Sequence, residues 1–158
     1  SIVDLIDDTI KSVQGIAMEL RPPILDAFGL YEALAWQAGE YEKRYGIQFD
    51  LNFPQKHVGL DKDLEVTLFR IFQESVTNVV RHSEANQVEV EVLHKSGQLV
   101  MKIRDNGIGI KQDKVKDSHS IGLIGIRERV RSWGGEVQFL GTDGKGTTVE
   151  VRIPIANK

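Results

Sequence analysis

The chain has 158 residues, a formal net charge of −3 and no cysteine. The lack of cysteine excludes disulfides and thiolate metal sites, and the interspersed charges argue against a nucleic-acid partner, which would require a basic face. No apolar run approaches the roughly 20 residues that span a bilayer. We therefore predict one folded domain in a reducing, cytoplasmic compartment. Because the first residue is Ser rather than Met, we expect a piece of a longer protein, which can itself be membrane-anchored.

Residues 1–20 predict an amphipathic helix ahead of this domain. Its apolar residues recur at helical spacing and are Ile2, Ile6, Ile10, Val13 and Leu20. Such a stripe can pack on its own domain or on a partner helix. Pro22-Pro23 then stop the helix and mark a boundary, so that residues 21–158 form the domain itself.

The rest of the chain predicts paired strands and helices without a regular β-α-β alternation. We expect helices at 29–45, 61–82 and 122–135, and strands at 47–53, within 86–105 on both sides of Ser96-Gly97, at 136–140 and at 147–155. Gly46 is expected to cap the first of these helices. The second should bury Leu64, Leu68, Ile71, Phe72, Ser75 and Val79. This order predicts an α/β fold, a two-layer sandwich of a mixed β-sheet with helices on one face.

The helix over 61–82 carries a polar row on one side. Glu74, Asn78 and His82 lie four residues apart and Arg81 lies beside them, so they are expected to line one face. An Asn oxygen suits Mg²⁺, Glu can orient a metal-bound water or accept a proton, and Arg can meet phosphate. A solvated polar face is the alternative for each residue alone. It is weakest for Asn78, because Asn is a poor helix former.

The stretch "IRDNGIGI" at 103–110 ends an apolar strand on Asp105. Asn106-Gly107 is a hairpin signal, but the polar residues that follow show no strand alternation, so a simple hairpin is the poorer account. A carboxylate only accepts hydrogen bonds, and it can therefore bind the exocyclic amine of adenine and repel the oxygen of guanine. Gly107 and Gly109 would let the backbone approach the base closely.

Two further glycine clusters follow this strand. Gly122 and Gly125 bracket a helix start, whose free N–H groups suit an anion, and the polar stretch 111–120 ahead of it is a candidate lid. Gly146 and Thr147 follow the turn in "GTDGKGTTVEV", where a hydroxyl can touch phosphate. A tightly packed helix start and a plain hairpin turn remain the alternatives for these clusters.

Taken in order, these motifs resemble the nucleotide-binding boxes of the GHKL superfamily, which comprises histidine kinases and gyrase-, chaperone- and mismatch-repair-type ATPases. Three longer stretches, "LRPPILDAFGL", "QESVTNVVRHSEA" and "GLIGIRERVRSWGGEV", resemble sensor histidine kinases of the NarL/DesK type. The resemblance covers roughly residues 19–155. It implies the Bergerat ATP-binding fold (the HATPase_c domain), ATP with Mg²⁺ as cofactors, and transfer of the γ-phosphoryl to a histidine for relay to a NarL-type response regulator.

The resemblance also implies a role for each matching residue. Asn78 and Glu74 would act at the metal and in catalysis. The nucleotide would be held by Asn78, Arg81, His82, Asp105, Gly107, Gly109, Ser120, Gly122, Leu123, Gly125, Gly146 and Thr147. Residues 1–20 resemble the end of the second helix of a dimerisation and phosphotransfer domain, which implies a homodimer in the full-length protein.

Two departures from the family pattern stand out. Ser120 occupies the place of the first lid glycine, which bears on the lid conformation, and none of the four histidines has the context of a phosphoacceptor. We therefore expect a catalytic fragment that binds ATP and needs an acceptor helix from outside the sequence. Two other functions stay open, a serine kinase of the anti-sigma type and a non-catalytic nucleotide-sensing adaptor.

Overall fold

The computed structural model describes residues 1–20, 22–56, 59–116 and 120–156. Its elements, in chain order, are α1 (Ile2–Leu20), α2 (Pro23–Phe28), α3 (Leu30–Tyr45), β1 (Gln48–Asn52), α4 (Lys62–Asn78), the π-helix η1 (Val79–Ser83), β2 (Gln87–Lys95), β3 (Gln98–Asp105), α5 (Gln112–Lys116), α6 (Ile121–Arg131), β4 (Glu136–Thr142) and β5 (Gly146–Pro154).

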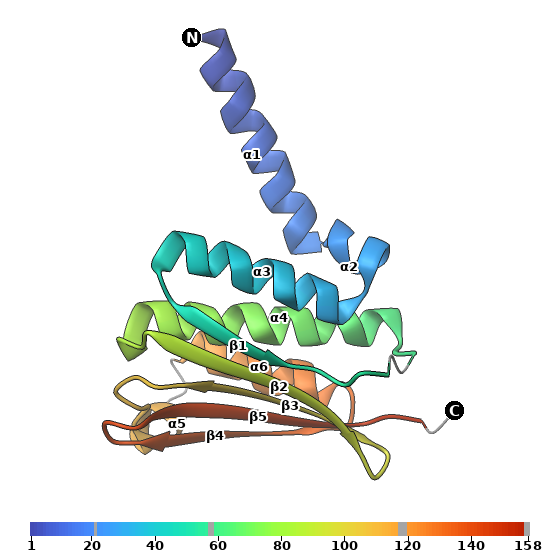
Figure 1. The fold of residues 1–158 in the computed structure, drawn as a ribbon, viewed down its shortest axis with the longest axis vertical. Helices are drawn as coiled ribbons and strands as arrows, with labels where there is room; N and C mark the ends of the chain where they lie inside the picture. The colour runs from blue at the N-terminus through green and yellow to red at the C-terminus, as the bar shows by residue number, and fades with distance from the viewer. Residues whose placement is uncertain (21, 57–58, 117–119, 157–158) are drawn as a thin grey trace.

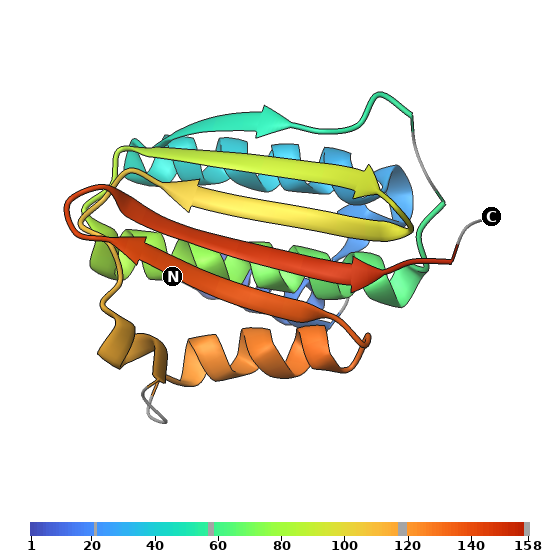
Figure 2. The same cartoon turned by 90° about the horizontal axis from the view of Figure 1, so that it is seen from below.

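The strands form one five-stranded sheet in the order β1-β2-β3-β5-β4. β1 pairs with β2 in parallel and the other pairs are antiparallel, so the sheet is mixed. Helices α3, α4 and α6 cover one face of the sheet, and its other face is bare (Figures 1 and 2). The predicted two-layer sandwich is thus confirmed.

The core lies between α4 and the inward-facing residues of the central strands. Alternate residues of β2, β3 and β5 are buried, as a sheet with one covered face requires. The six residues predicted for the buried side of α4 and its continuation are all in the core or buried. On the bare face, Lys102 lies 3.7 Å from Glu150 on the neighbouring strand. Charged cross-strand pairs of this kind keep an uncovered sheet face hydrated.

Local signals explain several of the element boundaries. The Asp61 side chain accepts hydrogen bonds from two amides of the first turn of α4 and caps it. Gly46 ends α3 in the left-handed conformation at φ 69°, as predicted. Ser96 and Gly97 both have positive φ at the β2–β3 turn, which is the geometry of a tight hairpin.

Several elements differ from the sequence prediction. Pro23 opens a short helix, α2, where we expected only a break, because proline is well suited to the first helical position. The helix expected to run to His82 is α-helical only to Asn78 and continues as the π-helix η1. The polar stretch 111–120, for which we predicted no helix, contains the short helix α5.

Helix α1 extends away from the rest of the molecule (Figure 1). The predicted apolar residues of this helix whose side chains are described are all exposed, Ile2 to 78% and Ile10 to 49%. The side chain of Leu20 lies outside the described residues. Within the described part of the chain, no helix has the length and apolarity that crossing a membrane requires.

Candidate functional site

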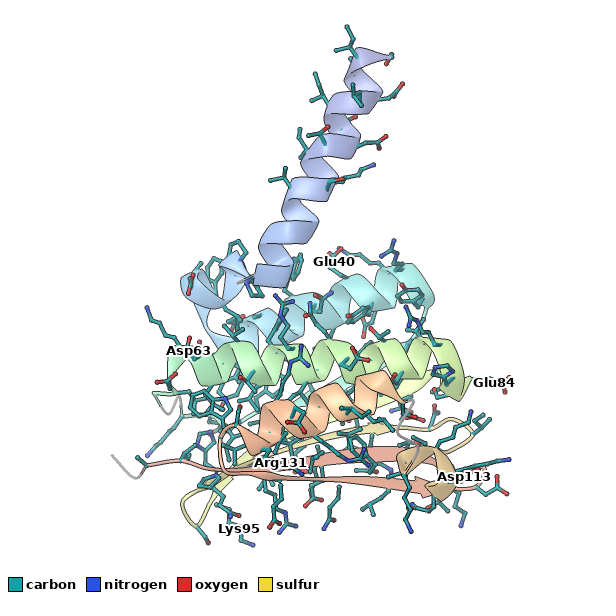
Figure 3. All side chains as sticks on the ribbon, turned by 180° about the vertical axis from the view of Figure 1, so that it is seen from behind. Glu40, Asp63, Glu84, Lys95, Asp113 and Arg131 are labelled. Atoms are coloured by element: carbon teal, nitrogen blue, oxygen red, sulfur yellow. The ribbon has the colours of Figure 1, made fainter. Side chains whose placement is uncertain are left out.

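The candidate residues gather at one end of the sandwich. There β3 ends at Asp105, β5 begins at Gly146, and the π-helix η1 ends next to the start of β2. In Figure 3, Glu84, which follows η1, and Asp113 of α5 lie at this end, whereas Asp63 and Lys95 lie at the opposite end. Figure 2 shows α5 beside the start of α6 and the β4–β5 turn.

Asp105 is a buried carboxylate at the end of a central strand, only 5% exposed. Burial raises the pKa of its carboxyl group above 3.8, while hydrogen bonds from the backbone of Gly107 and Thr147 oppose this rise. The Gly107 amide lies 2.9 Å from Oδ1. The two amides orient the carboxylate and favour its ionised form, which can accept a further hydrogen bond from a ligand.

The loop after Asp105 passes so close to other backbone that side chains do not fit. A Cβ on Gly107 would overlap the carbonyl oxygen of Ser83, and a Cβ on Gly146 would overlap that of Asp105. Gly109 and Gly146 also have φ of 86° and 92°, which disfavours any residue with a side chain. These glycines therefore let the loop pack directly on neighbouring backbone beside the carboxylate.

Glu74 and Asn78 converge on the first turn of α6. A Cβ at Gly122 would overlap Glu74 Oε1 and lie 3.5 Å from Asn78 Oδ1. Two hard oxygen donors thus face one point beside a helix N-terminus, an arrangement that fits Mg²⁺ together with phosphate oxygens. The structure brings Gly122 against Glu74 and Asn78, although Gly122 is far from both in the sequence.

Arg81 and His82 lie on the π-helix η1, and both are exposed. The wider π turn changes their angular position relative to a continuous α-helix, so the row predicted from four-residue spacing is regular only from Glu74 to Asn78. Short π-helices occur frequently at functional sites. Both side chains remain at the site end of the molecule.

Thr147 joins β5 to the loop that follows Asp105. Its hydroxyl oxygen accepts a hydrogen bond from the amide of Ile110 at 2.7 Å. The amide of Gly144 donates to the carbonyl of Ile108 at 2.9 Å, so the β4–β5 turn holds this loop at two points. The geometry gives Thr147 an anchoring role, which leaves its hydroxyl hydrogen free to donate.

Helix α5 is held by two side chains that donate to its last carbonyls. The Ser120 hydroxyl donates to the carbonyl of Lys114 at 3.1 Å, and the Arg127 guanidinium donates to that of Val115. The same guanidinium lies 5.0 Å from the centre of the Phe139 ring. Ser120, the departure from the family pattern, thus contacts α5 in this structure.

The remaining two predicted residues are part of α6. Leu123 is buried in the core, so it positions the helix by packing. A Cβ on Gly125 would lie 3.0 Å from the Arg129 side chain, outside the Glu74–Asn78 cluster. Arg127 itself was not predicted, because nothing in its local sequence indicates a contact with α5.

Comparison with known proteins agrees with this geometry. Residues 63–157 match the family described as histidine kinase-, DNA gyrase B-, and HSP90-like ATPase. The chain belongs to this ATPase family. The matched segment contains every predicted site residue, from Glu74 to Thr147. The predicted membership in the HATPase_c family is thereby confirmed.

Two curated relatives of this ATPase domain are sensor histidine kinases. The chain is 39% identical over 145 residues to the sensor histidine kinase LiaS of Bacillus subtilis (strain 168), covering 92% of the chain and 39% of LiaS. It is 33% identical over 149 residues to the sensor histidine kinase ComP of the same organism, covering 94% of the chain and 19% of ComP. The chain therefore spans less than half of either relative.

Solved structures show the same fold. The histidine kinase domain of the blue-light activated kinase of Erythrobacter litoralis EL346 has a TM-score of 0.66 at 23% identity, with 80% of this chain and 61% of that one covered. The Acinetobacter baumannii histidine kinase AdeS has a TM-score of 0.66 at 16% identity, with 98% and 81% covered. These likenesses support the GHKL fold.

Proposed function

We propose that this domain binds ATP with Mg²⁺ and catalyses transfer of the γ-phosphoryl group to a histidine in a two-component sensor kinase. The acceptor would lie on a dimerisation helix of the parent protein, and a response regulator of the NarL type would receive the phosphoryl group. The observation that carries the proposal is the placement of a buried carboxylate, Asp105, at the same end of the sandwich as the Glu74–Asn78–Gly122 cluster.

Asp105 is proposed to select adenine. The Gly107 and Thr147 amides hold its carboxylate, which can accept a hydrogen bond from the exocyclic amine of the base. A guanine would place an oxygen against the same carboxylate. The loop glycines let the backbone next to this carboxylate pack closely on its neighbours, which fixes the position of the strand end that carries it.

Asn78 and Glu74 are proposed to hold Mg²⁺, directly or through a water molecule. The bound ion would neutralise charge on the triphosphate. Free N–H groups in the first turn of α6 and the exposed Arg81 and His82 would meet the phosphates from the protein side. Phosphoryl transfer mainly needs this positioning and charge compensation.

The acceptor histidine is proposed to come from the helices that precede α1 in the parent. Helix α1 exposes an apolar stripe, Ile2, Ile6 and Ile10 among others, at helical spacing. We propose that α1 is the end of the second dimerisation helix, that this stripe packs on partner helices in a homodimer, and that the domain acts in the cytoplasm.

Incubating the full-length parent with ATP labelled in the γ position tests this proposal. A histidine kinase should acquire acid-labile, base-stable phosphate, because a phosphoramidate hydrolyses in acid. Acid-stable phosphate would identify a serine kinase. ATP binding without any transfer would identify a nucleotide-sensing adaptor, and either outcome would contradict the proposal.

The Gly122→Ala variant should fold normally but transfer phosphate poorly. The added Cβ meets the flexible end of Glu74, so it displaces that carboxylate from Asn78 at little cost to the fold. Misplacing a catalytic group by about 1 Å costs roughly two orders of magnitude in rate. Autophosphorylation of the parent, measured beside thermal unfolding, checks this result.

The matched control is Gly39→Ala, on α3, where an added Cβ meets nothing within 4 Å. Both variants gain helix propensity, about 1 kcal/mol for each glycine replaced by alanine. Equal transfer rates in the two variants would show that the approach of Glu74 to Gly122 has no part in the reaction.

A further inference from the structure

Asn106, the residue after the buried carboxylate, binds the start of β2 through its whole amide group. Its Oδ1 accepts hydrogen bonds from the backbone amides of Asn86 and Gln87, both at 3.1 Å. Its Nδ2 donates to Asn86 Oδ1 at 2.6 Å, and its own amide donates to the carbonyl of Gln87 at 3.2 Å. An exposed side chain rarely makes this many fixed contacts without a structural or functional reason.

Backbone conformation does not explain the asparagine. Asn-Gly is favoured in tight turns because both residues tolerate positive φ. Among the described residues, only Glu84 and Ser96 combine a side chain with positive φ, and Gly107 is not among the glycines with positive φ either. Asn106 therefore contributes through its side-chain hydrogen bonds.

Ser83 holds the same loop from the other side. The amide of Ile108 donates to the Ser83 carbonyl at 2.8 Å. The buried Ser83 hydroxyl donates to the carbonyl of Val79 at 2.9 Å and accepts a bond from the Ala85 amide at 3.1 Å. Ser83 ends the π-helix that follows Asn78. These bonds therefore connect the loop to α4, the helix that carries Glu74 and Asn78.

Gly107 thus lies between two fixed points, and Asp105 directly precedes the first of them. Asn106 attaches the chain to β2, and Ile108 attaches it to η1. Without the Asn106 side chain, β3 would end in a loop held only by backbone contacts next to a glycine. The direction of the Asp105 carboxylate would then be less well defined, because backbone freedom at the strand end is transmitted to its side chain.

We propose that Asn106 is a positioning residue for nucleotide recognition. The recognition clamp, which we define as Asn106, Asn86 and Ser83, fixes the Asp105 carboxylate relative to the α4–η1 helix and so sets both affinity and selectivity for adenine nucleotides. This inference rests on the proposed function. In the proposed role, Asn106 contacts neither the base nor the phosphates.

Nucleotide binding to the 158-residue chain tests the clamp. The affinities for ATP and GTP are measured in the presence of Mg²⁺ by competition against a fluorescent ATP analogue. Asn106→Ala should weaken ATP binding about tenfold, the effect of one or two hydrogen bonds. GTP binding should change little, so the ratio of the two affinities falls. The unfolding temperature should move only slightly, because Asn106 is exposed.

Asn106→Asp should restore most of the ATP affinity. Its carboxylate can still accept from the amides of Asn86 and Gln87, and the Asn86 side-chain amide can rotate to donate to it. The control is Asn52→Ala, an exposed asparagine at the end of β1, which should leave both affinities unchanged.

The outcomes separate the clamp from the proposed function. A wild-type chain without preference for ATP would contradict the proposed function itself. A wild-type preference that Asn106→Ala retains in full would overturn the clamp alone, even if the variant were less stable. Failure of Asn106→Asp to recover affinity would overturn the role assigned to the acceptor oxygen.

Discussion

Replacing Asp105 by asparagine should weaken ATP binding about hundredfold, equivalent to about 2.7 kcal/mol, while the fold persists. Asparagine has nearly the same shape, but it lacks the charge that strengthens a hydrogen bond from the adenine amine. Its Nδ2 would also face a donor, either the amine or one of the two backbone amides that now bind the carboxylate. Calorimetric titration of wild type and variant with ATP and Mg²⁺ measures the effect.

The same variant should gain stability relative to the wild type as the pH rises from acidic to neutral. Burial raises the pKa of Asp105 above 3.8, so ionisation costs more in the folded state than in the unfolded state. This penalty is absent below 3.8 and grows as the pH rises through the folded-state pKa. Asparagine does not ionise, so the variant does not have this cost in folding free energy. Thermal unfolding at neutral and acidic pH therefore should show the wild type gaining stability relative to the variant on acidification.

Binding should respond to pH in the opposite direction. The ionised carboxylate is the form that accepts a hydrogen bond from adenine, so ATP affinity should fall as the pH drops through the raised pKa of Asp105. The asparagine variant provides the control, because titration of the phosphates affects both proteins and only the difference belongs to Asp105. A variant that binds ATP as tightly as the wild type would refute the adenine assignment.

The Gly146→Ala variant should lose about 3 kcal/mol of stability and most of its nucleotide binding. Gly146 has φ 92°, and a Cβ there would overlap the backbone carbonyl of Asp105, which cannot move without displacing the end of β3. The unfavourable backbone conformation costs about 1 kcal/mol and the overlap about 2 kcal/mol more. Urea unfolding monitored by circular dichroism measures the loss.

Gly144→Ala separates the two costs. Gly144 also has positive φ, 69°, but a Cβ there meets nothing within 4 Å. This control should lose only about 1 kcal/mol and retain ATP binding. If both variants lost the same free energy of unfolding, the contact between Gly146 and the Asp105 carbonyl would not constrain the loop.

Periodicity and turn chemistry predicted most of the fold correctly. The buried side of α4 followed from helical spacing, and Gly46 and Ser96-Gly97 were recognisable as a cap and a turn. These features depend on neighbours in the sequence. The π-helix and α5 were missed because their existence depends on contacts with distant parts of the chain, such as that between Arg127 and Val115.

The candidate site shows the same difference between features that depend on nearby residues and features that depend on distant contacts. Glu74, Asn78 and Asp105 were identified because their residue types and motifs indicate the chemistry. Ser83 and Asn106 were not identified as site residues, because their partners become neighbours only in the folded sheet. Sequence patterns therefore indicated which groups we propose to meet a ligand, and the structure was needed to find the groups that contact the loop after Asp105.

The central claim is that one carboxylate recognises the base while an Asn–Glu pair supports the metal at the triphosphate. Calorimetry of this chain with ATP and GTP, each with and without Mg²⁺, tests it most directly. We expect tight binding of ATP that strengthens with Mg²⁺, and much weaker binding of GTP. Equal affinities for the two nucleotides in the presence of Mg²⁺ would contradict the account.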